Sequence, residues 1–201
     1  MSEEAYLLRF PKPFSFRAGQ VTGLTTEVTL SPRLYSIASG ENEDMLEILF
    51  DVKQEGMLSP RLARLEPGDT LYVTSPKGSF IPSDKESVWV AAGTGIAPYL
   101  SMLRSGYQAS LLIQGARTRQ DLYFHDLLEK RFASAYFPCL SREDTDGFYR
   151  GRVTGLLETL PLLDSRYLYY LCGSAEMVVD SREVLLKRGI PYNNILAEVY
   201  F

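Results

Sequence analysis

The chain has 201 residues, of which 45% are hydrophobic and 23% charged, enough for one large domain or two small ones with a buried core. A formal net charge of -4 and a pI near 5.2 exclude a global basic field, so we expect neither nucleic acid nor a membrane as partner. No apolar run reaches the roughly 18 residues of a membrane span. The opening MSEEAYLLRF has acids where a signal peptide has basic residues, and we expect a cytoplasmic protein.

Metal ligands are scarce in this sequence. Cys139 and Cys172 form no CxxC pair, and His125 is the single histidine. A zinc or iron-sulfur centre built on this chain therefore lacks ligands, and we expect no metal site. If the protein moves electrons, an organic cofactor carries them.

The first part of the chain reads as short strands. Residues 6–10, 20–24, 46–52 and 70–75 are β-prone runs separated by breaks rich in Gly, Pro and Asn. This spacing predicts a small antiparallel β-barrel of the Greek-key type. The segment SPKGSFIPSDKES then marks a connection, so we expect one domain at 1–84 and a second at 85–201.

The second part changes in texture. Apolar runs at 87–92, 110–115, 134–140, 166–173 and 194–201 read as buried strands, and helix-period segments lie between them at 98–106, 121–132, 153–160 and 175–189. This alternation predicts a doubly wound parallel sheet covered by helices. The expected fold class is therefore β + α/β.

A glycine turn marks the first strand end of this second part. In VWVAAGTGIAPYL, Gly93 and Gly95 follow the strand, and Pro98 suits the first turn of the next helix. Glycines there let the backbone approach a pyrophosphate, which the amides of a helix N-terminus also favour. The same turn also occurs between ordinary strands and helices, so it predicts a dinucleotide site only together with other signals.

Arginines follow the next two strand ends. A site for NAD usually has an acid after its second strand to hold the ribose hydroxyls, whereas GARTRQD supplies Arg117 and Arg119. The later segment LSREDTDGFYRGRV adds Ser141, Arg142 and Arg152, a hydroxyl and two guanidinium groups suited to a phosphate. Any one of them is more commonly a solvated surface arginine, but their combination favours NADP.

Two segments of the first part suggest a flavin. In a strand, Arg33 and Tyr35 of SPRLYSIAS share one face, so a phosphate and a flat ring can be held together, with Ser36 beside them. In EGMLSPRL, Gly56 and Ser59 open a helical turn whose free amides suit a pyrophosphate. A half-buried strand and a plain N-cap explain each segment equally well when it is taken alone.

Together these motifs resemble the ferredoxin-NADP reductase family, particularly its bacterial ferredoxin or flavodoxin reductases. The resemblance runs from about Phe10 to the C-terminus and rests on RLYS at 33–36, GMLS at 56–59, GTGIAP at 93–98, SRE with GRV at 141–153, CGSAEM at 172–177 and the terminal EVYF. It implies an FAD-binding barrel joined to an NADP-binding domain. It also implies an enzyme that takes hydride from NADPH and passes single electrons to a separate ferredoxin or flavodoxin. We expect a monomer.

The resemblance implies a role for each motif. Tyr35 packs on one flavin face, and Tyr200 covers the other until the nicotinamide arrives. The implied catalytic residues are Ser36, Cys172, Glu198 and Tyr200. The implied flavin-binding residues are Arg33, Leu34, Tyr35, Ser36, Gly56, Met57, Leu58, Ser59, Thr94, Tyr200 and Phe201. The implied NADP-binding residues are Gly93, Thr94, Gly95, Ile96, Pro98, Arg117, Ser141, Arg142, Arg152, Cys172, Gly173 and Met177.

One departure and several alternatives accompany this resemblance. Family members usually have an additional barrel strand before PFSFRAGQ, and only about ten residues precede it here. A reductase component of an oxygenase and a free-flavin reductase are alternatives. Oxygenase reductases commonly carry a fused iron-sulfur domain, and two cysteines exclude one within this chain. A flavoprotein electron-transfer subunit with little activity alone is a further alternative, but the terminal cysteine cluster of that class is absent.

Overall fold

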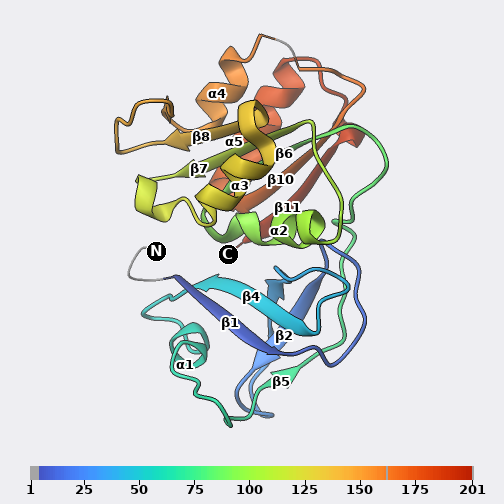
Figure 1. The fold of residues 1–201 in the computed structure, drawn as a ribbon, viewed down its shortest axis with the longest axis vertical. Coiled ribbons are helices and arrows are strands. Elements are labelled where there is room, and N and C mark those ends of the chain that lie inside the picture. Colours follow the sequence, from blue (N-terminus) through green and yellow to red (C-terminus); the bar gives the residue numbers. More distant parts are fainter. Residues whose placement is uncertain (1–4, 162, 201) are drawn as a thin grey trace. The chain divides into compact units, whose positions relative to one another are not determined.

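A computed structural model describes residues 5–161 and 163–200, which form two compact units (Figure 1). The described residues up to Pro82, together with Ala97–Tyr107, form what we call the barrel unit. Ser83–Ile96 and the described residues from Gln108 onward form the sheet unit. The chain thus enters the sheet unit, returns to the barrel unit for one helix, and enters the sheet unit again. The assignment of 1–84 to FAD and 85–201 to NADP stays a prediction.

The barrel unit is antiparallel, as expected. Strand β1 pairs with β4, β2 pairs with both β3 and β5, and a bridge between Ile37 and Ile48 joins the two groups. In the described residues β1 has β4 as its only partner strand. The strands are β1 (Ala5–Pro11), β2 (Val21–Thr25), β3 (Arg33–Ser36), β4 (Met45–Asp51) and β5 (Tyr72–Val73).

The core of the barrel unit follows from strand alternation. Leu46, Ile48 and Phe50 occupy every second position of β4 and therefore point to one face, where all three are buried. The short helix α1 (Ser59–Leu62) adds Leu62 to this cluster. Each fully buried side chain of this size contributes about 1.5–3 kcal/mol. This core supports β3, which carries RLYS.

The sheet unit contains a parallel sheet of six strands in the order β11-β10-β6-β7-β8-β9. The strands are β6 (Ser87–Ala92), β7 (Leu111–Ala116), β8 (Tyr136–Leu140), β9 (Tyr149–Arg150), β10 (Leu168–Ser174) and β11 (Ile195–Tyr200). The longer helices of the chain are α2 (Ala97–Arg104, in the barrel unit), α3 (His125–Phe132), α4 (Val153–Thr159) and α5 (Ala175–Lys187). The described residues also form the short 3-10 turns η1 (Gly93–Ile96), η2 (Arg119–Asp121), η3 (Ala133–Ala135) and η4 (Tyr192–Asn194).

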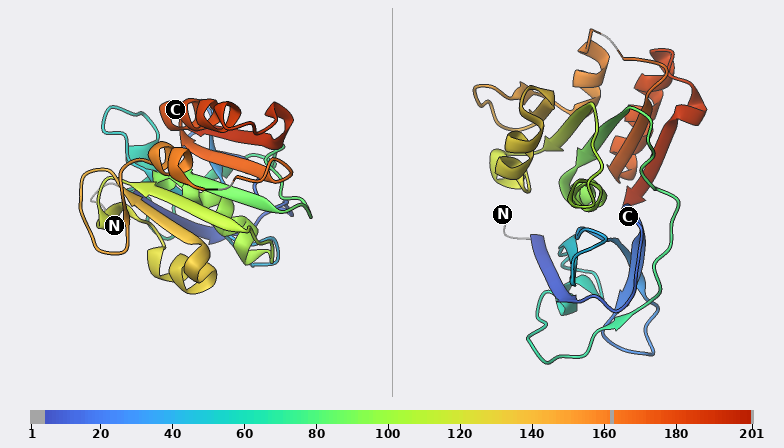
Figure 2. Two further views of the ribbon diagram at one scale, coloured as in Figure 1. Left: turned by 90° about the horizontal axis from the view of Figure 1, so that it is seen from above. Right: turned by 45° about the vertical axis from the view of Figure 1, so that its right-hand side comes forward.

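Helices cover both faces of this sheet, with α3 on one face and α4 and α5 on the other (Figure 2). The sequence of β6 explains why both faces are buried. Val88 and Val90 belong to the cluster formed with α4 and α5, whereas Trp89 points the other way and meets Phe132 of α3 with 6.0 Å between ring centroids. A continuous apolar run is therefore required, and the expected β + α/β class is confirmed.

One helix begins later than its sequence pattern suggests. The pattern predicts a helix over 121–132, whereas α3 begins at His125. Thr118 and Asp121 form a capping box that holds the separate turn η2, and Phe124 takes a left-handed backbone conformation with φ of 60°. The local cap therefore overrides the helical period. Along the described stretches, no helix has the length and apolarity to cross a membrane.

Candidate functional site

The turn η1 lies against the end of β10. A Cβ atom on Gly95 would lie 2.6 Å from the carbonyl carbon of Cys172 and 2.9 Å from the Cα of Gly173, so only glycine permits this contact. Gly93 adopts a left-handed φ of 56° with open space around it. Strand β6 lies between β10 and β7, the place where the strand order reverses and where such sheets bind nucleotides. The GTGIAP motif lies at this strand end, with Thr94 and Ile96 in η1 and Pro98 in the first turn of α2, and its contact with a nucleotide stays a prediction.

Three of the predicted catalytic residues meet on β10 and β11. Cys172 pairs with Glu198 across the two strands, and Ser174 pairs with Tyr200. Burial raises the pKa of the Cys172 thiol, the nearby Glu198 charge raises it further, and a hydrogen bond from Tyr200 opposes both. The thiol is therefore protonated at neutral pH, and Glu198 occupies the paired position on the neighbouring strand. The predicted NADP residues Gly173 and Met177 adjoin it, since a Cβ on Gly173 would lie 2.6 Å from the Met177 methyl carbon.

Cationic side chains gather at the carboxyl ends of β7 and β8. The backbone N of Ser141 donates to the carbonyl of Ala116 at 3.0 Å, and that of Arg142 donates to the carbonyl of Arg117 at 2.9 Å. These two bonds join the loops, so Arg117, Ser141 and Arg142 lie close together with exposed side chains. A phosphate with two negative charges fits such a set of guanidinium and hydroxyl donors.

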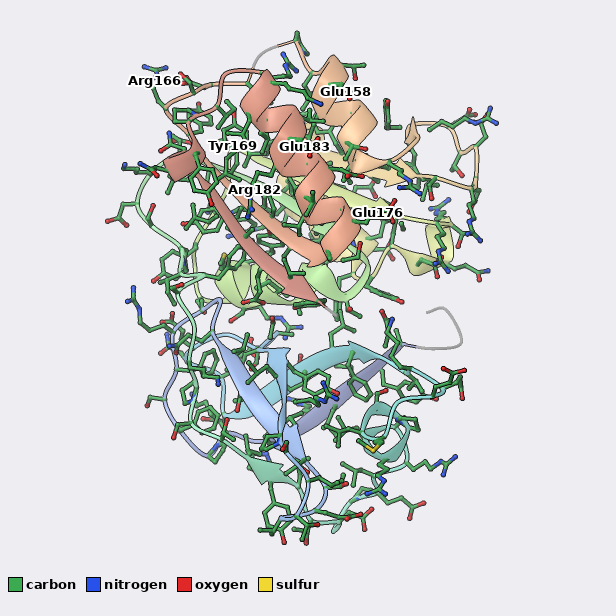
Figure 3. All side chains as sticks on the ribbon, turned by 180° about the vertical axis from the view of Figure 1, so that it is seen from behind. Glu158, Arg166, Tyr169, Glu176, Arg182 and Glu183 are labelled. Atoms are coloured by element: carbon green, nitrogen blue, oxygen red, sulfur yellow. The ribbon has the colours of Figure 1, made fainter. Side chains whose placement is uncertain are left out.

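Arg152, the remaining predicted arginine, is the N-cap residue of α4. Its guanidinium forms an ion pair with Glu176 in the first turn of α5, and both side chains are about two-thirds exposed, at 66% and 65%. Figure 3 shows Glu176 at the end of α5 that lies at the carboxyl edge of the sheet. This pair raises the pKa of Arg152. The Arg152 charge is thus available to a phosphate that competes with Glu176.

An open depression of about 510 Å³ lies on the same edge, lined by Thr118, Arg119, Gln120 and Glu143. Sequence reasoning identified Arg119 as a residue favouring NADP, but it missed Glu143 and Gln120. A signal that could have identified Glu143 as a site residue is its position next to Arg142, shortly after the end of a predicted strand. Nothing in the sequence indicates that its carboxylate reaches the loop after β7.

In the barrel unit, the RLYS motif forms β3 as expected. Arg33 is exposed, Tyr35 is half-buried and Ser36 is buried. Phe50 supports the Tyr35 ring edge-on at a centroid distance of 5.9 Å. Burial raises the pKa of the Tyr35 hydroxyl, and the Arg33 charge opposes this shift. A rigid aromatic ring therefore lies on the same strand face as a solvent-accessible cation, and Leu34 on the opposite face is 52% exposed.

The GMLS motif forms a tight turn before α1. The amide of Gly56 donates to the carbonyl of Lys53 at 2.7 Å, and the Ser59 hydroxyl accepts a hydrogen bond from the Lys53 amide at 2.9 Å. Within residues 5–161 and 163–200, no hydrogen bond uses the amides of Met57 and Leu58. A pyrophosphate fits free amides of this kind.

Ser36 belongs to the barrel unit and the Cys172 cluster to the sheet unit, so the predicted catalytic set is distributed over both. Phe201, predicted to bind flavin, lies outside the described residues. In the described part of the chain, no group of three or more His, Cys, Asp or Glu side chains could hold a metal ion.

Comparisons with known proteins agree with this geometry. The family model described as "Oxidoreductase NAD-binding domain" matches residues 89–183. A flavodoxin/ferredoxin-NADP reductase of Escherichia coli (strain K12) is 34% identical over 192 residues, covering 83% of this chain and 77% of that protein. The reductase component of propane 2-monooxygenase of Mycolicibacterium smegmatis is 32% identical over 213 residues, covering 94% of this chain and 60% of that protein.

A solved structure matches both units. The ferredoxin NADP+ reductase of Neisseria gonorrhoeae, crystallised with bound FAD and NADP, superposes with a TM-score of 0.89 at 25% sequence identity. The match covers 98% of this chain and 93% of that one. The barrel and sheet units therefore occur together in a solved flavoprotein.

Proposed function

Because the chain belongs to the ferredoxin-NADP reductase family, we propose that it is a flavin-dependent oxidoreductase that moves electrons between NADPH and a separate one-electron carrier, ferredoxin or flavodoxin. Its cofactors are FAD and NADP(H). FAD, when bound, supplies the conversion between hydride and single electrons. The single observation that carries the choice of NADP is the cationic cluster of Arg117, Ser141 and Arg142, because an arginine follows β7 where a site for NAD has an acid.

In this proposal the sheet unit binds NADPH. Arg117, Arg142 and Arg152, with the Ser141 hydroxyl, hold the 2'-phosphate, and the glycines of η1 let the pyrophosphate approach the backbone. The nicotinamide end reaches Cys172 and Gly173. The close contact of Cys172 and Gly173 with Gly95 supports this placement, because it puts the end of β10 beside η1, so that both can face the same NADPH molecule.

The catalytic residues of the sheet unit act through position and charge. The charge of Glu198 raises the pKa of the neighbouring Cys172 thiol, which is neutral. Such a charge favours the positive charge of an oxidised nicotinamide ring over the neutral reduced ring. The pair therefore stabilises the product of hydride donation and orients the ring for it.

The barrel unit holds FAD in this proposal. Arg33 binds the pyrophosphate together with the free amides of Met57 and Leu58, and Tyr35 packs on the flavin ring. Stacking of Tyr200 and a hydrogen bond from Ser36 on the same ring remain predictions from the family resemblance.

We place the protein in the cytoplasm. Its two cysteines are both free and buried, which supports a reducing compartment because secreted domains commonly pair their thiols. A monomer is the proposed state. The carrier is proposed to be a separate protein, ferredoxin or flavodoxin, because a relative named for these two carriers matches most of this chain.

A second candidate is the reductase component of an oxygenase. The similarity to the propane 2-monooxygenase reductase favours it, but the chain spans only 60% of that protein, compared with 77% of the Escherichia coli reductase. Activity with ferredoxin or flavodoxin and none with an oxygenase component separates the two candidates.

A steady-state experiment tests the proposal. The purified protein should show an oxidised flavin spectrum and reduce ferricyanide with a higher kcat/KM for NADPH than for NADH. Absence of flavin, or a preference for NADH, contradicts it.

A further inference from the structure

A carboxylate joins the two loops of the cationic cluster. Glu143 Oε2 accepts a hydrogen bond from the backbone N of Arg119 at 2.7 Å, and Glu143 Oε1 accepts one from the Thr145 hydroxyl at 3.0 Å. Both oxygens of this half-buried side chain are therefore engaged. One bond reaches the loop after β7, and the other stays in the loop after β8.

The loop after β7 is held together by hydrogen bonds of its own, so its position depends on where it is attached. The amide and hydroxyl of Thr118 both donate to Asp121 Oδ2, at 3.2 and 3.0 Å. Phe148 of the other loop also supports it, since the Arg119 guanidinium carbon lies 5.6 Å from that ring centroid. Loss of the hydrogen bond between the Arg119 amide and Glu143 would consequently let the whole loop move, including Arg119.

Charge alone predicts the opposite role for Glu143. Its carboxylate lines the depression beside Arg119, where it would repel a bound phosphate. A carboxylate in this place improves phosphate binding only if its effect on the position of the cations exceeds its own repulsion. The two engaged oxygens and the short bond to the Arg119 amide favour that outcome.

We propose that Glu143 is a positioning residue. It holds the loop after β7, which carries Arg117 and Arg119, against Ser141 and Arg142, and so raises the preference of the protein for a 2'-phosphorylated adenosine. The inference rests on the proposed function, since it presumes that the cluster binds the 2'-phosphate of NADP. It adds to that function a residue that acts through the backbone of the loop carrying Arg119 and does not contact the ligand.

The test is calorimetric binding of 2'-phospho-AMP and of 5'-AMP to the full flavin-loaded chain. Glu143→Ala should weaken 2'-phospho-AMP binding about tenfold, the value of one well-placed charged hydrogen bond, and leave 5'-AMP binding unchanged. Glu143→Gln should give a smaller loss, because its amide oxygen still accepts one bond. In turnover, Glu143→Ala should raise KM for NADPH with little change in kcat and spare NADH.

Asp144→Asn is the matched control. Asp144 is the adjacent carboxylate, 70% exposed, and pairs with Arg150 at 2.9 Å, so the variant removes the same charge without touching the turn. It should bind 2'-phospho-AMP as well as the parent or more tightly. If Glu143→Ala behaves like Asp144→Asn, or if it weakens both ligands equally, the positioning role is wrong.

The parent protein separates this inference from the proposed function. If the parent binds 2'-phospho-AMP no better than 5'-AMP, the assignment of NADP fails and the inference fails with it. If the parent prefers 2'-phospho-AMP and both Glu143 variants keep that preference, only the inference is overturned.

Discussion

Gly95 packs against the backbone of Cys172 so closely that a single added carbon would lie 2.6 Å from the Cys172 carbonyl carbon. The contact joins the turn after β6 to the end of β10. Gly95→Ala should therefore push η1 away from β10, costing about 1–3 kcal/mol of unfolding free energy and weakening NADPH binding.

Gly93→Ala is the control for that substitution. A Cβ at Gly93 meets nothing within 4 Å, but its φ of 56° is left-handed. This variant should lose about 1 kcal/mol through backbone strain alone and keep more of its NADPH affinity. Urea unfolding and NADPH titration of both variants provide the comparison, and equal NADPH losses would argue against the proposed contact.

The arginines proposed to hold the 2'-phosphate should determine nucleotide preference. Arg142→Ala and Arg152→Ala should each raise KM for NADPH about tenfold while sparing NADH, since only NADPH carries the 2'-phosphate. Steady-state kinetics with both nucleotides measure this. Equal losses for NADPH and NADH would remove these residues from the phosphate site.

Glu176 competes with the phosphate for Arg152. Glu176→Gln removes the ion pair with Arg152 and should lower KM for NADPH by a small factor. Asp180→Asn is a suitable control, because Asp180 acts on Arg152 only through weaker charge interaction. A higher KM in Glu176→Gln would show that Glu176 supports the site.

The barrel unit contains a partly buried ion pair that should be important for stability. Arg104 of α2 donates to Glu47 Oε2 at 2.5 Å, with side-chain exposures of 24% and 11%. Arg104→Ala removes the main partner of the largely buried Glu47 charge, and should lower the free energy of unfolding by about 2 kcal/mol. Arg9→Ala removes a more exposed partner, 3.5 Å from Glu47, and should cost less than about 1 kcal/mol. Urea unfolding of both variants tests this order.

The buried thiols should make the fold sensitive to alkali. Burial raises the pKa of Cys139 from 9.0 to about 12, and that of Cys172 also rises. Above pH 9 the unfolded chain ionises these thiols while the folded chain does not, so stability present below pH 9 should be lost as the pH rises towards 12. Urea midpoints at neutral pH and at about pH 10 measure the loss.

Thiol reactivity checks the same feature independently. At pH 8 both thiols should react with a disulfide reagent slowly in the native protein and rapidly in denaturant. Rapid reaction of the native protein would contradict the burial of Cys139 and Cys172.

Much of the fold could be predicted because the signals are local. The apolar run of β6 indicated a strand buried on both faces, and Trp89 with Val90 confirms it. The resemblance to the reductase family is confirmed by the 34% identical Escherichia coli relative. A local apolar run sufficed for the first conclusion, and the order and spacing of short motifs sufficed for the second.

The remaining features depend on contacts that are distant in sequence. Arg104 and Glu47 are 57 positions apart, and Glu143 and Arg119 are 24 apart. Neither pair has a periodic or motif signal, because each requires the tertiary fold to bring its two elements together. The late start of α3 was missed for another reason, since the capping box at Thr118 and Asp121 competes locally with the helical pattern.

Anaerobic stopped-flow mixing tests the central claim most directly. The purified flavoprotein is mixed with NADPH and then with oxidised ferredoxin or flavodoxin, while flavin absorbance is followed. The account predicts rapid bleaching by NADPH, slower bleaching by NADH, and recovery of the oxidised flavin as the carrier is reduced. Flavin that NADPH does not bleach, or that recovers no faster with either carrier than without one, would contradict it.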